Sequence, residues 1–368
     1  MKIVNNLIGA SLAKKLSEQW LASPELSLVI TPDPLTTTQL IEVIGFFDDE
    51  IPCHTFPDWE TLPYDILSPH QNVISHRIAT LSRLLNQENH LLFVTIKTLM
   101  AYLCPKSYIG TQHLNFKVGD TLDRETFKQQ CTNAGYHVVN NVIEPGECAF
   151  RGSIIDIFPT GLKKPLRIDL FDNEIDSIKT FDTESQRSIG TKEQINLLPA
   201  HEFPTDQAAI SRFRKNWRER FPGSTKHCPI YRDVSQGLIP SGIEYYLPLF
   251  FDSCDTLFDY LPSSARLYLV NDLFETSDQF EQVLKIRYQQ RSSDITRPIL
   301  PVEQLFQPTD KVFAKLKQFE RISLNQKPKE KYNAAVKKIE KIAIDRKSNE
   351  PLAKLIKFLN HNQSKSVN

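Results

Sequence analysis

The sequence predicts an α/β protein in which an α/β layer is interrupted by a small α+β domain. Strand and helix patterns alternate over the first hundred residues. The apolar runs Leu26 to Thr31 and Leu91 to Thr95 have the length of buried strands, and Pro69 to Leu85 between them carries apolar residues at helical spacing. Such alternation favours a mostly parallel sheet. The pattern changes near Pro105.

After that change the sequence is typical of a small α+β domain. Asp123 to Ala134 has the pattern of a helix. Three short runs then predict an antiparallel meander, namely Ser153 to Phe158, Leu166 to Phe171 and Glu174 to Phe181. The first two of these runs flank the sequence Pro-Thr-Gly-Leu-Lys-Lys-Pro, whose Pro and Gly residues are typical of turns.

The α/β pattern then returns, and it is expected to complete the first layer. We expect a helix within His201 to Arg220 and strands at Tyr245 to Phe251 and Leu267 to Val270. Ser323 to Tyr332 is polar and rich in lysine, so it is expected to be a linker. Leu352 to Leu359 is expected to form one amphipathic helix.

Composition and charge bound the class of protein. Hydrophobic residues make up 40% and charged residues 24% of the chain, as in soluble globular proteins. We expect no membrane-spanning helix, no signal peptide and a cytoplasmic location. The net charge is zero, but residues 321–368 contain 12 Lys and Arg against 4 Asp and Glu. This basic tail is either a surface for nucleic acid or a solvated helix or linker.

Motifs for catalysis and for cofactors are not found in the sequence. A P-loop needs glycines and a Gly-Lys-Ser/Thr at the helix start, but the first buried strand is followed by Pro32-Asp33-Pro34. The two prolines remove N–H donors, and Asp33 would repel a phosphate. The cysteines form no CxxC pair, and no G-x-S-x-G or H-E-x-x-H occurs. We therefore expect no cofactor, no metal and no catalytic residue.

The predicted strand Leu166 to Phe171 presents an unusual outer face. Side chains alternate along a strand, so Arg167, Asp169 and Phe171 share the face opposite the apolar residues, and Arg151 can join them from the preceding strand. Arginine and aromatic residues are enriched in binding hot spots. The alternative is a surface Arg–Asp pair with a Phe packed on a neighbouring loop. Composition alone leaves both interpretations open.

Several long motifs resemble one family, the bacterial transcription-repair coupling factors (Mfd). The motifs are EPGECAFRGSIIDIFP (144–159), LRIDLFDNEIDSIKTFDTESQRS (166–188), INLLPAHEFP (195–204), FPDWETLPYDILSPHQNVISHR (56–77) and GIEYYLPLFF (242–251). The resemblance implies a module homologous to UvrB, with a degenerate helicase-like α/β domain in two segments around a small inserted domain that binds UvrA. Carried over through the motifs, the UvrA-binding residues are Arg151, Arg167 and Phe171.

The resemblance also sets the expected domain limits and the role of single residues. The helicase-like domain spans 1–106 and 200–322, the UvrA-binding domain 107–199, and a basic linker with the incomplete start of another domain 323–368. Asp169 is expected to orient Arg167. We predict that Arg167→Ala removes most UvrA binding without unfolding the domain.

The expected function is a UvrB-like module that recruits UvrA in transcription-coupled nucleotide excision repair. Members of the family continue into an RNA polymerase-binding domain and ATP-driven motor domains, which this sequence does not include. We interpret the chain as a truncated or split gene product, and we expect no enzymatic activity from it. Two alternatives are a DNA-binding module acting through the basic tail, and an assignment at family level as a DNA translocase with ATPase activity.

Overall fold

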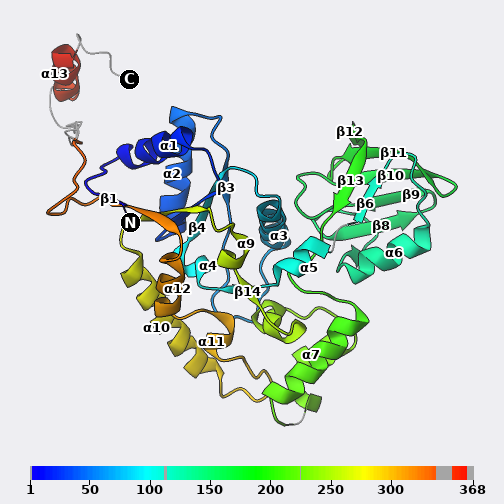
Figure 1. The fold of residues 1–368 in the computed structure, drawn as a ribbon. Helices are drawn as coiled ribbons and strands as arrows, with labels where there is room; N and C mark the ends of the chain where they lie inside the picture. The colour runs from blue at the N-terminus through cyan, green and yellow to red at the C-terminus, as the bar shows by residue number, and fades with distance from the viewer. Residues whose placement is uncertain (1, 112–113, 224, 337–349, 363–368) are drawn as a thin grey trace.

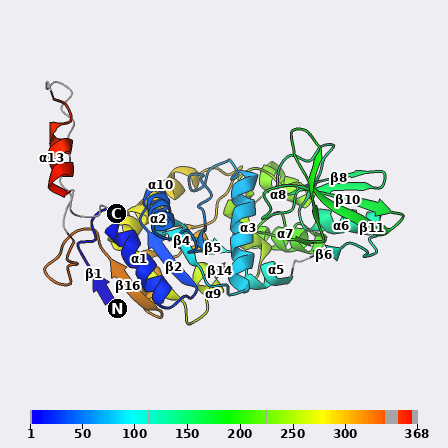
Figure 2. The same cartoon turned by 90° about the horizontal axis from the view of Figure 1, so that it is seen from above.

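The structure is a computed structural model that describes residues 2–111, 114–223, 225–336 and 350–362. Figures 1 and 2 show a larger α/β part and, at its side, a smaller part rich in strands that is formed by the middle of the chain. Within the described ranges, no helix has the length and apolar character needed to cross a bilayer.

A parallel sheet of six strands lies at the centre of the larger part. The strand order is β1 (Lys2–Val4), β16 (Glu320–Leu324), β15 (Arg266–Val270), β2 (Ser27–Thr31), β4 (Leu91–Thr95) and β3 (Cys53–Thr55). All of the neighbouring pairs are parallel, which confirms the predicted sheet type. Strands from both ends of the chain therefore belong to one sheet.

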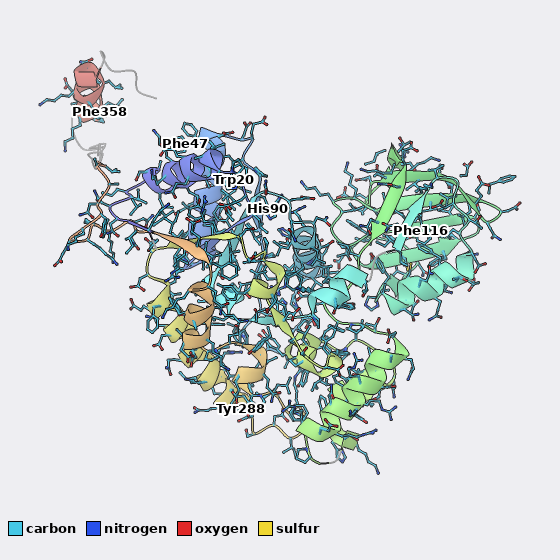
Figure 3. The ribbon with its side chains drawn as sticks, viewed as in Figure 1. Trp20, Phe47, His90, Phe116, Tyr288 and Phe358 are labelled. Atoms are coloured by element: carbon cyan, nitrogen blue, oxygen red, sulfur yellow. The ribbon has the colours of Figure 1, made fainter. Side chains whose placement is uncertain are left out.

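Helices cover both faces of this sheet. As a consequence, every residue of β2 and β4 is buried. Val29 and Phe93 face a core formed with α1 (Ser11–Ala22) and α2 (Pro34–Phe47). Their neighbours in the strands face a larger core that includes α3 (Gln71–Leu85). Figure 3 shows Trp20 of α1 in the first of these cores. The remaining elements of this part are α4 (Ile96–Leu99), β5 (Tyr102–Leu103), α5 (Lys106–Thr111), α7 (Gln207–Arg220), η1 (Thr225–His227), α8 (Pro229–Ser235), η2 (Ile243–Phe250), β14 (Asp255–Thr256), α9 (Leu257–Tyr260), α10 (Leu273–Arg291), α11 (Val302–Leu305) and α12 (Thr309–Leu316), and α13 (Ala353–Asn362) follows later in the chain.

The smaller part, called the small domain below, contains its own sheet and its own core. Its strand order is β12 (Ser188–Lys192), β11 (Glu174–Phe181), β10 (Leu166–Phe171), β9 (Ile154–Ile157), β8 (Glu147–Arg151) and β7 (His137–Val138). The pairs from β8 to β12 are antiparallel, so the predicted meander is present. One face packs on α6 (Arg124–Asn133), and Phe116, labelled in Figure 3, packs against this core. The entering strand β6 (Leu114–Lys117) pairs with the leaving strand β13 (Gln194–Leu197). The exact domain limits given above stay predictions.

A buried ion pair lies where the small domain joins the larger part. Arg77 of α3 is 1% exposed and Glu202, just after the small domain, is 4% exposed. The Arg77 Nε donates to Glu202 Oε1 at 2.5 Å, and its Nη1 donates to the Pro57 carbonyl oxygen at 2.7 Å. The Trp59 Nε1 donates to the same carboxylate at 3.3 Å, and the guanidinium lies 4.3 Å from the centre of the Phe56 ring. This cluster joins α3 and the segment before it to Glu202, which lies 125 residues after Arg77.

A close backbone contact lies beside that ion pair. Gly161 has φ +86, and a Cβ at this position would lie 2.9 Å from the Ala79 Cβ. The Gly161 N–H donates to Ser75 Oγ at 2.8 Å. The turn after β9 therefore rests directly on α3, and a larger residue at Gly161 would clash there and adopt an unfavourable backbone conformation.

Two of the expected elements differ in the structure. Tyr245 to Phe251 was expected to be a strand, but η2 is a 3₁₀ helix over most of this segment. Pro248 within it has no N–H for a strand ladder, so the apolar run packs into the core as a helix instead. Ser323 to Tyr332 was expected to be a linker, but β16 includes Ser323 and Leu324. The chain then follows β1, because the Asn5 N–H donates to the Tyr332 carbonyl oxygen at 2.8 Å.

One buried carboxyl group, that of Glu244, is expected to make the stability of the protein depend on pH. Glu244 is 5% exposed and accepts a hydrogen bond from Ser68 Oγ at 2.9 Å, and burial raises its pKa from 4.5 to about 7. Between these two values the folded state binds more protons than the unfolded state, so this group makes stability fall as pH rises. We expect Glu244→Gln to be more stable than the wild type at pH 8 by on the order of 3 kcal/mol.

The difference between the two proteins is the quantity to measure, since other titrating groups then cancel. Urea unfolding followed by tryptophan fluorescence at pH 4 and pH 8 supplies it. The advantage of the variant should disappear below pH 4.5, where Glu244 is protonated in both states. An advantage that is equal at both pH values would show that the charge of Glu244 is not its cause.

Candidate functional site

The outer face of the small sheet brings the predicted binding residues together. Arg167 on β10 lies directly opposite Asp156 on β9, and Ala149 on β8 lies opposite Asp156 on the other side. Residues directly opposite each other point to the same face, and so do residues two apart in one strand. Arg151, two residues after Ala149, therefore shares the face with Arg167, as predicted.

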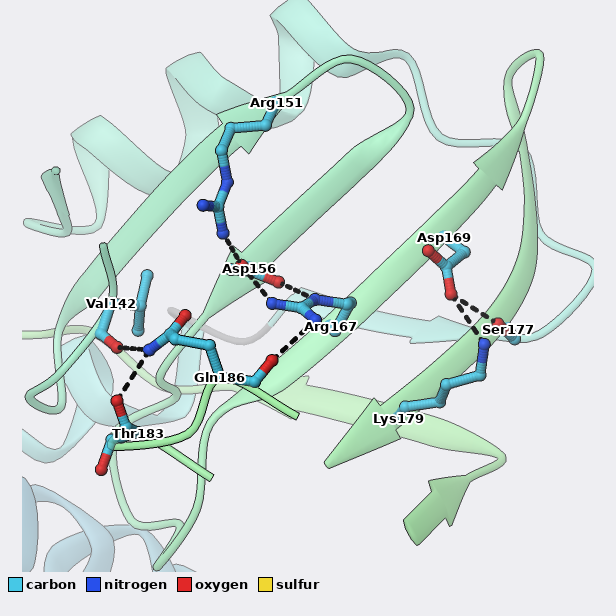
Figure 4. Close-up of polar contacts among 9 residues, drawn as sticks. All are labelled: Val142, Arg151, Asp156, Arg167, Asp169, Ser177, Lys179, Thr183 and Gln186. Atoms are coloured by element: carbon cyan, nitrogen blue, oxygen red, sulfur yellow. Dashed lines mark hydrogen bonds and ion pairs between the residues drawn. The ribbon is translucent and has the colours of Figure 1, made fainter. Parts of the chain in front are cut away.

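Asp156 holds both arginines (Figure 4). Its side chain is fully buried, and its two oxygens accept from Arg167 Nε at 2.7 Å and from Arg167 Nη2 at 2.9 Å. The Arg151 Nη2 donates to Asp156 Oδ2 as well. A buried carboxylate is costly unless it is paired, and here two guanidinium groups neutralise it. The hydrogen bonding of Arg167 to the Asp156 carboxylate, which favours the charged guanidinium, raises the pKa of Arg167.

The two arginines differ in how far they reach the surface. The Arg167 side chain is 18% exposed, its Nη1 donates to the Gln186 carbonyl oxygen at 3.1 Å, and its guanidinium lies 4.8 Å from the centre of the Phe181 ring. The Arg151 side chain is 47% exposed. Arg167 is therefore part of the packing of the small domain, whereas Arg151 has donors that remain open to a partner.

Asp169 does not orient Arg167, so that expectation is wrong. Its Oδ2 accepts from Lys179 Nζ at 2.9 Å and from Ser177 Oγ at 3.0 Å, as Figure 4 shows. Ser177 is directly opposite Asp169 on β11, and Lys179 lies two pairs further along, directly opposite Arg167. The lysine ammonium was thus the nearer cation, and it was overlooked because the sequence does not give the β10–β11 register.

Phe171 ends β10 at the edge of this face and is 75% exposed. Asp172 follows with φ +54 in the tight turn to β11, and the register of the pair shifts between Asp169 and Leu170. An aromatic ring left in water here does not pack on a neighbouring loop, which removes that alternative for Phe171. Exposed aromatic side chains are frequent anchors of protein interfaces.

Sequence reasoning missed Asp156, which organises the site. A signal was present, because Asp156 is the one acid within the apolar strand Ile154–Ile157. A carboxylate inside a buried strand requires a charged partner. The sequence alone did not show which of the basic residues nearby supplies it.

At the edge of the large sheet where a nucleotide would bind, the N-terminus of α2 is capped by a side chain of the protein itself. Asp33 caps α2: its Oδ1 accepts from the Thr36 N–H at 2.8 Å and its Oδ2 from Thr36 Oγ1 at 2.8 Å. Pro34 occupies the first turn. A carboxylate thus takes the position at the helix N-terminus where a phosphate would otherwise be held.

Comparisons with known proteins match both the small domain and the chain at large. A family model described as the UvrB interaction domain matches residues 114–203, which include the small sheet, α6 and Glu202. The transcription-repair-coupling factor of Haemophilus influenzae is 42% identical over 88% of this chain, and that of Escherichia coli is 40% identical over the same share. The protein of the same name from Rickettsia prowazekii is 33% identical over 62% of the chain.

The chain is a relative of the transcription-repair coupling factors. The resemblance seen in the motifs is confirmed, since the two matches that cover 88% of the chain agree on the same protein. The chain spans 28% of the length of each of these two relatives. Activities and partners of the whole transcription-repair coupling factor are therefore not assigned to this chain by similarity alone.

Proposed function

We propose that the small domain recruits UvrA, and that this chain is the UvrB-like module of a transcription-coupled repair system. One observation carries the proposal: Arg151 and Arg167 are set by a shared buried Asp156 on the sheet face that ends at the exposed Phe171. This face lies within the region that matches the UvrB interaction domain.

The proposed contact combines charge and apolar burial. Arg151 is half exposed and keeps donors free for a carboxylate on UvrA, and charge-assisted hydrogen bonds of this kind are among the strongest in interfaces. Phe171 supplies an apolar anchor. Arg167 contributes indirectly, because it neutralises the buried Asp156 and keeps this carboxylate in position to orient Arg151. The arrangement is formed before the partner arrives, which lowers the entropy cost of binding.

The other expected activities depend on regions of the longer relatives that are not matched by this chain, or on residues of this chain that the structure does not describe. RNA polymerase binding and ATP-driven translocation are expected of the longer members of the family. We assign neither of them, nor any enzymatic activity, to this chain. The alternative of DNA binding through the basic tail is only partly placed by the structure, because half of the Lys and Arg residues of the tail fall in 337–349 and 363–368, outside the described residues. A cytoplasmic location is part of the same proposal.

Truncating the aromatic anchor tests the proposal. We expect Phe171→Ala to weaken UvrA binding by about 30-fold or more, since loss of an interface hot spot costs about 2 kcal/mol or more. Isothermal titration calorimetry with purified UvrA measures it. The fold should be unaffected, because the ring is 75% exposed.

A matched control is Phe46→Ala, which removes an 82% exposed ring from α2, in the larger part of the molecule. Its affinity for UvrA should equal that of the wild type. If the wild-type chain fails to bind UvrA, the proposed function is wrong. If the wild-type chain binds UvrA and Phe171→Ala binds it equally well, UvrA is the correct partner but the assigned binding surface is wrong.

A further inference from the structure

A second surface of the protein concentrates positive charge. Residues 207–232 contain seven Lys and Arg and one carboxylate, Glu219. They form α7 (Gln207–Arg220), η1 and α8 (Pro229–Ser235), and α7 packs on α8. Figure 1 shows α7 at the outer edge of the molecule, below the small domain.

The apolar side of α7 explains why these charges lie on the solvent side of the helix and at its flanks. Ala209, Ile210, Phe213 and Trp217 are buried in the large core, so the remaining positions turn outwards. The outward positions carry basic side chains on successive turns. The basic residues of this surface, called the α7 basic face below, are Arg212, Arg214, Lys215, Arg218, Arg220, Lys226 and Arg232.

Four of the seven cations make contacts within the protein: Arg212, Arg214, Arg218 and Arg232. Arg212 pairs with Asp252 at 3.5 Å and Arg232 with Asp233 at 2.9 Å. Among the described residues, Lys215, Arg220 and Lys226 make no ion pair and no side-chain hydrogen bond. The last turn of a helix favours cations through the helix dipole, which accounts for Arg220 but not for Lys215 or Lys226.

Concentrating like charges disfavours folding, so the α7 basic face is not explained by stability. Arg214 and Arg218 are four residues apart on one helix, a spacing at which like charges repel. The Arg218 Nη2 donates to the Tyr231 hydroxyl at 2.8 Å, which orients its guanidinium along the surface. A polyanion bound here would relieve the repulsion and would release its own counterions.

We propose that the α7 basic face binds the phosphate backbone of double-stranded nucleic acid without reading its sequence. Between Gln207 and Arg232 no large apolar side chain is exposed among the described residues, and the exposed Ile295 borders this segment beside Arg220 and His227. The face itself therefore lacks the apolar anchors of a protein interface. The Phe, Trp and Tyr rings of this segment are buried or half-buried, and the His227 imidazole is its one exposed aromatic ring among the described residues. A single exposed ring does not form the row of stacking platforms that single strands require. Positive charge with one exposed ring and no exposed large apolar side chain of its own fits a duplex backbone. The proposal is independent of the UvrA surface.

Fluorescence anisotropy with a labelled DNA duplex of about 20 base pairs tests this on the whole chain between 50 and 200 mM salt. The variant is Lys215→Gln/Arg220→Gln/Lys226→Gln. We expect affinity at 50 mM salt to fall at least about tenfold, and the slope of log K against log salt to become shallower by about 2 to 3, since each phosphate contact contributes about 0.9.

The control removes three exposed lysines elsewhere, Lys163→Gln/Lys164→Gln/Lys311→Gln, with the same change of net charge. It retains the basic tail, as the first variant does, so tail binding contributes equally to both. Wild-type affinity and slope in the control, with loss in the α7 variant, support the proposal. Equal losses in both variants, a tighter complex with a single strand than with the duplex, or a tighter complex with a poly-glutamate peptide would each overturn it.

Discussion

Glu202→Gln is expected to lower the free energy of unfolding of the α/β part by about 3–5 kcal/mol, the usual cost of removing one partner of a buried ion pair. The reason is the position of Arg77, which is 1% exposed and donates to both oxygens of Glu202. A neutral amide would leave the guanidinium buried without a counter-charge. It would also place an NH₂ group against a donor of Arg77, at one of the two positions where Glu202 now accepts.

Tryptophan fluorescence during urea unfolding measures this effect directly. All three tryptophans, Trp20, Trp59 and Trp217, lie in the α/β part, so the signal does not report on the small domain. The control is Glu88→Gln, which breaks the exposed pair with Arg83, 3.8 Å apart, and should cost less than about 1 kcal/mol. A similar small cost for Glu202→Gln would mean that the buried pair does not hold the two parts together.

Arg167→Ala is expected to destabilise the small domain as well as to reduce UvrA binding, which revises the prediction made from the sequence. Asp156 would keep only Arg151 as a partner inside a fully buried site, at a cost of about 3 kcal/mol or more. Arg151→Ala leaves both hydrogen bonds from Arg167 to Asp156 in place, so it should lower UvrA affinity with little loss of stability.

Two measurements separate the roles of the two arginines. Hydrogen exchange of peptides from β9 and β10 reports the stability of the small domain, and calorimetry with UvrA reports binding. The stability control is Lys179→Ala, which breaks the half-exposed pair with Asp169 and should cost under about 1 kcal/mol. Faster exchange in Arg151→Ala than in Arg167→Ala would contradict the assigned roles. So would unchanged UvrA affinity in Arg151→Ala.

The regular elements could be predicted from the sequence because local pattern determines them. The apolar run Leu91 to Thr95 and the strand Leu166 to Phe171 have the limits that their residues indicate. Strand periodicity also placed Arg167 and Phe171 on one face, which the structure confirms. The segment from Tyr245 to Phe251 was misread, because a short apolar run has the same composition in a strand and in a buried 3₁₀ helix.

The ion-pair partners could not be predicted, because they depend on strand register and on contacts between distant segments. Asp169 is nearest in sequence to Arg167, but the register of β9 and β10 places Asp156 opposite it. Arg77 and Glu202 are 125 residues apart, and only the packing of α3 against the end of the small domain brings them together.

By itself the sequence determined the alternation of strands and helices, the motifs shared with transcription-repair coupling factors and the residue types on the outer face of β10. Tertiary structure alone decided that Arg167 is mainly packed and Arg151 is open, and that Asp156 holds them both. The physical reason is that periodicity fixes the face on which a side chain lies, whereas burial and charge pairing depend on which neighbouring strand lies opposite it.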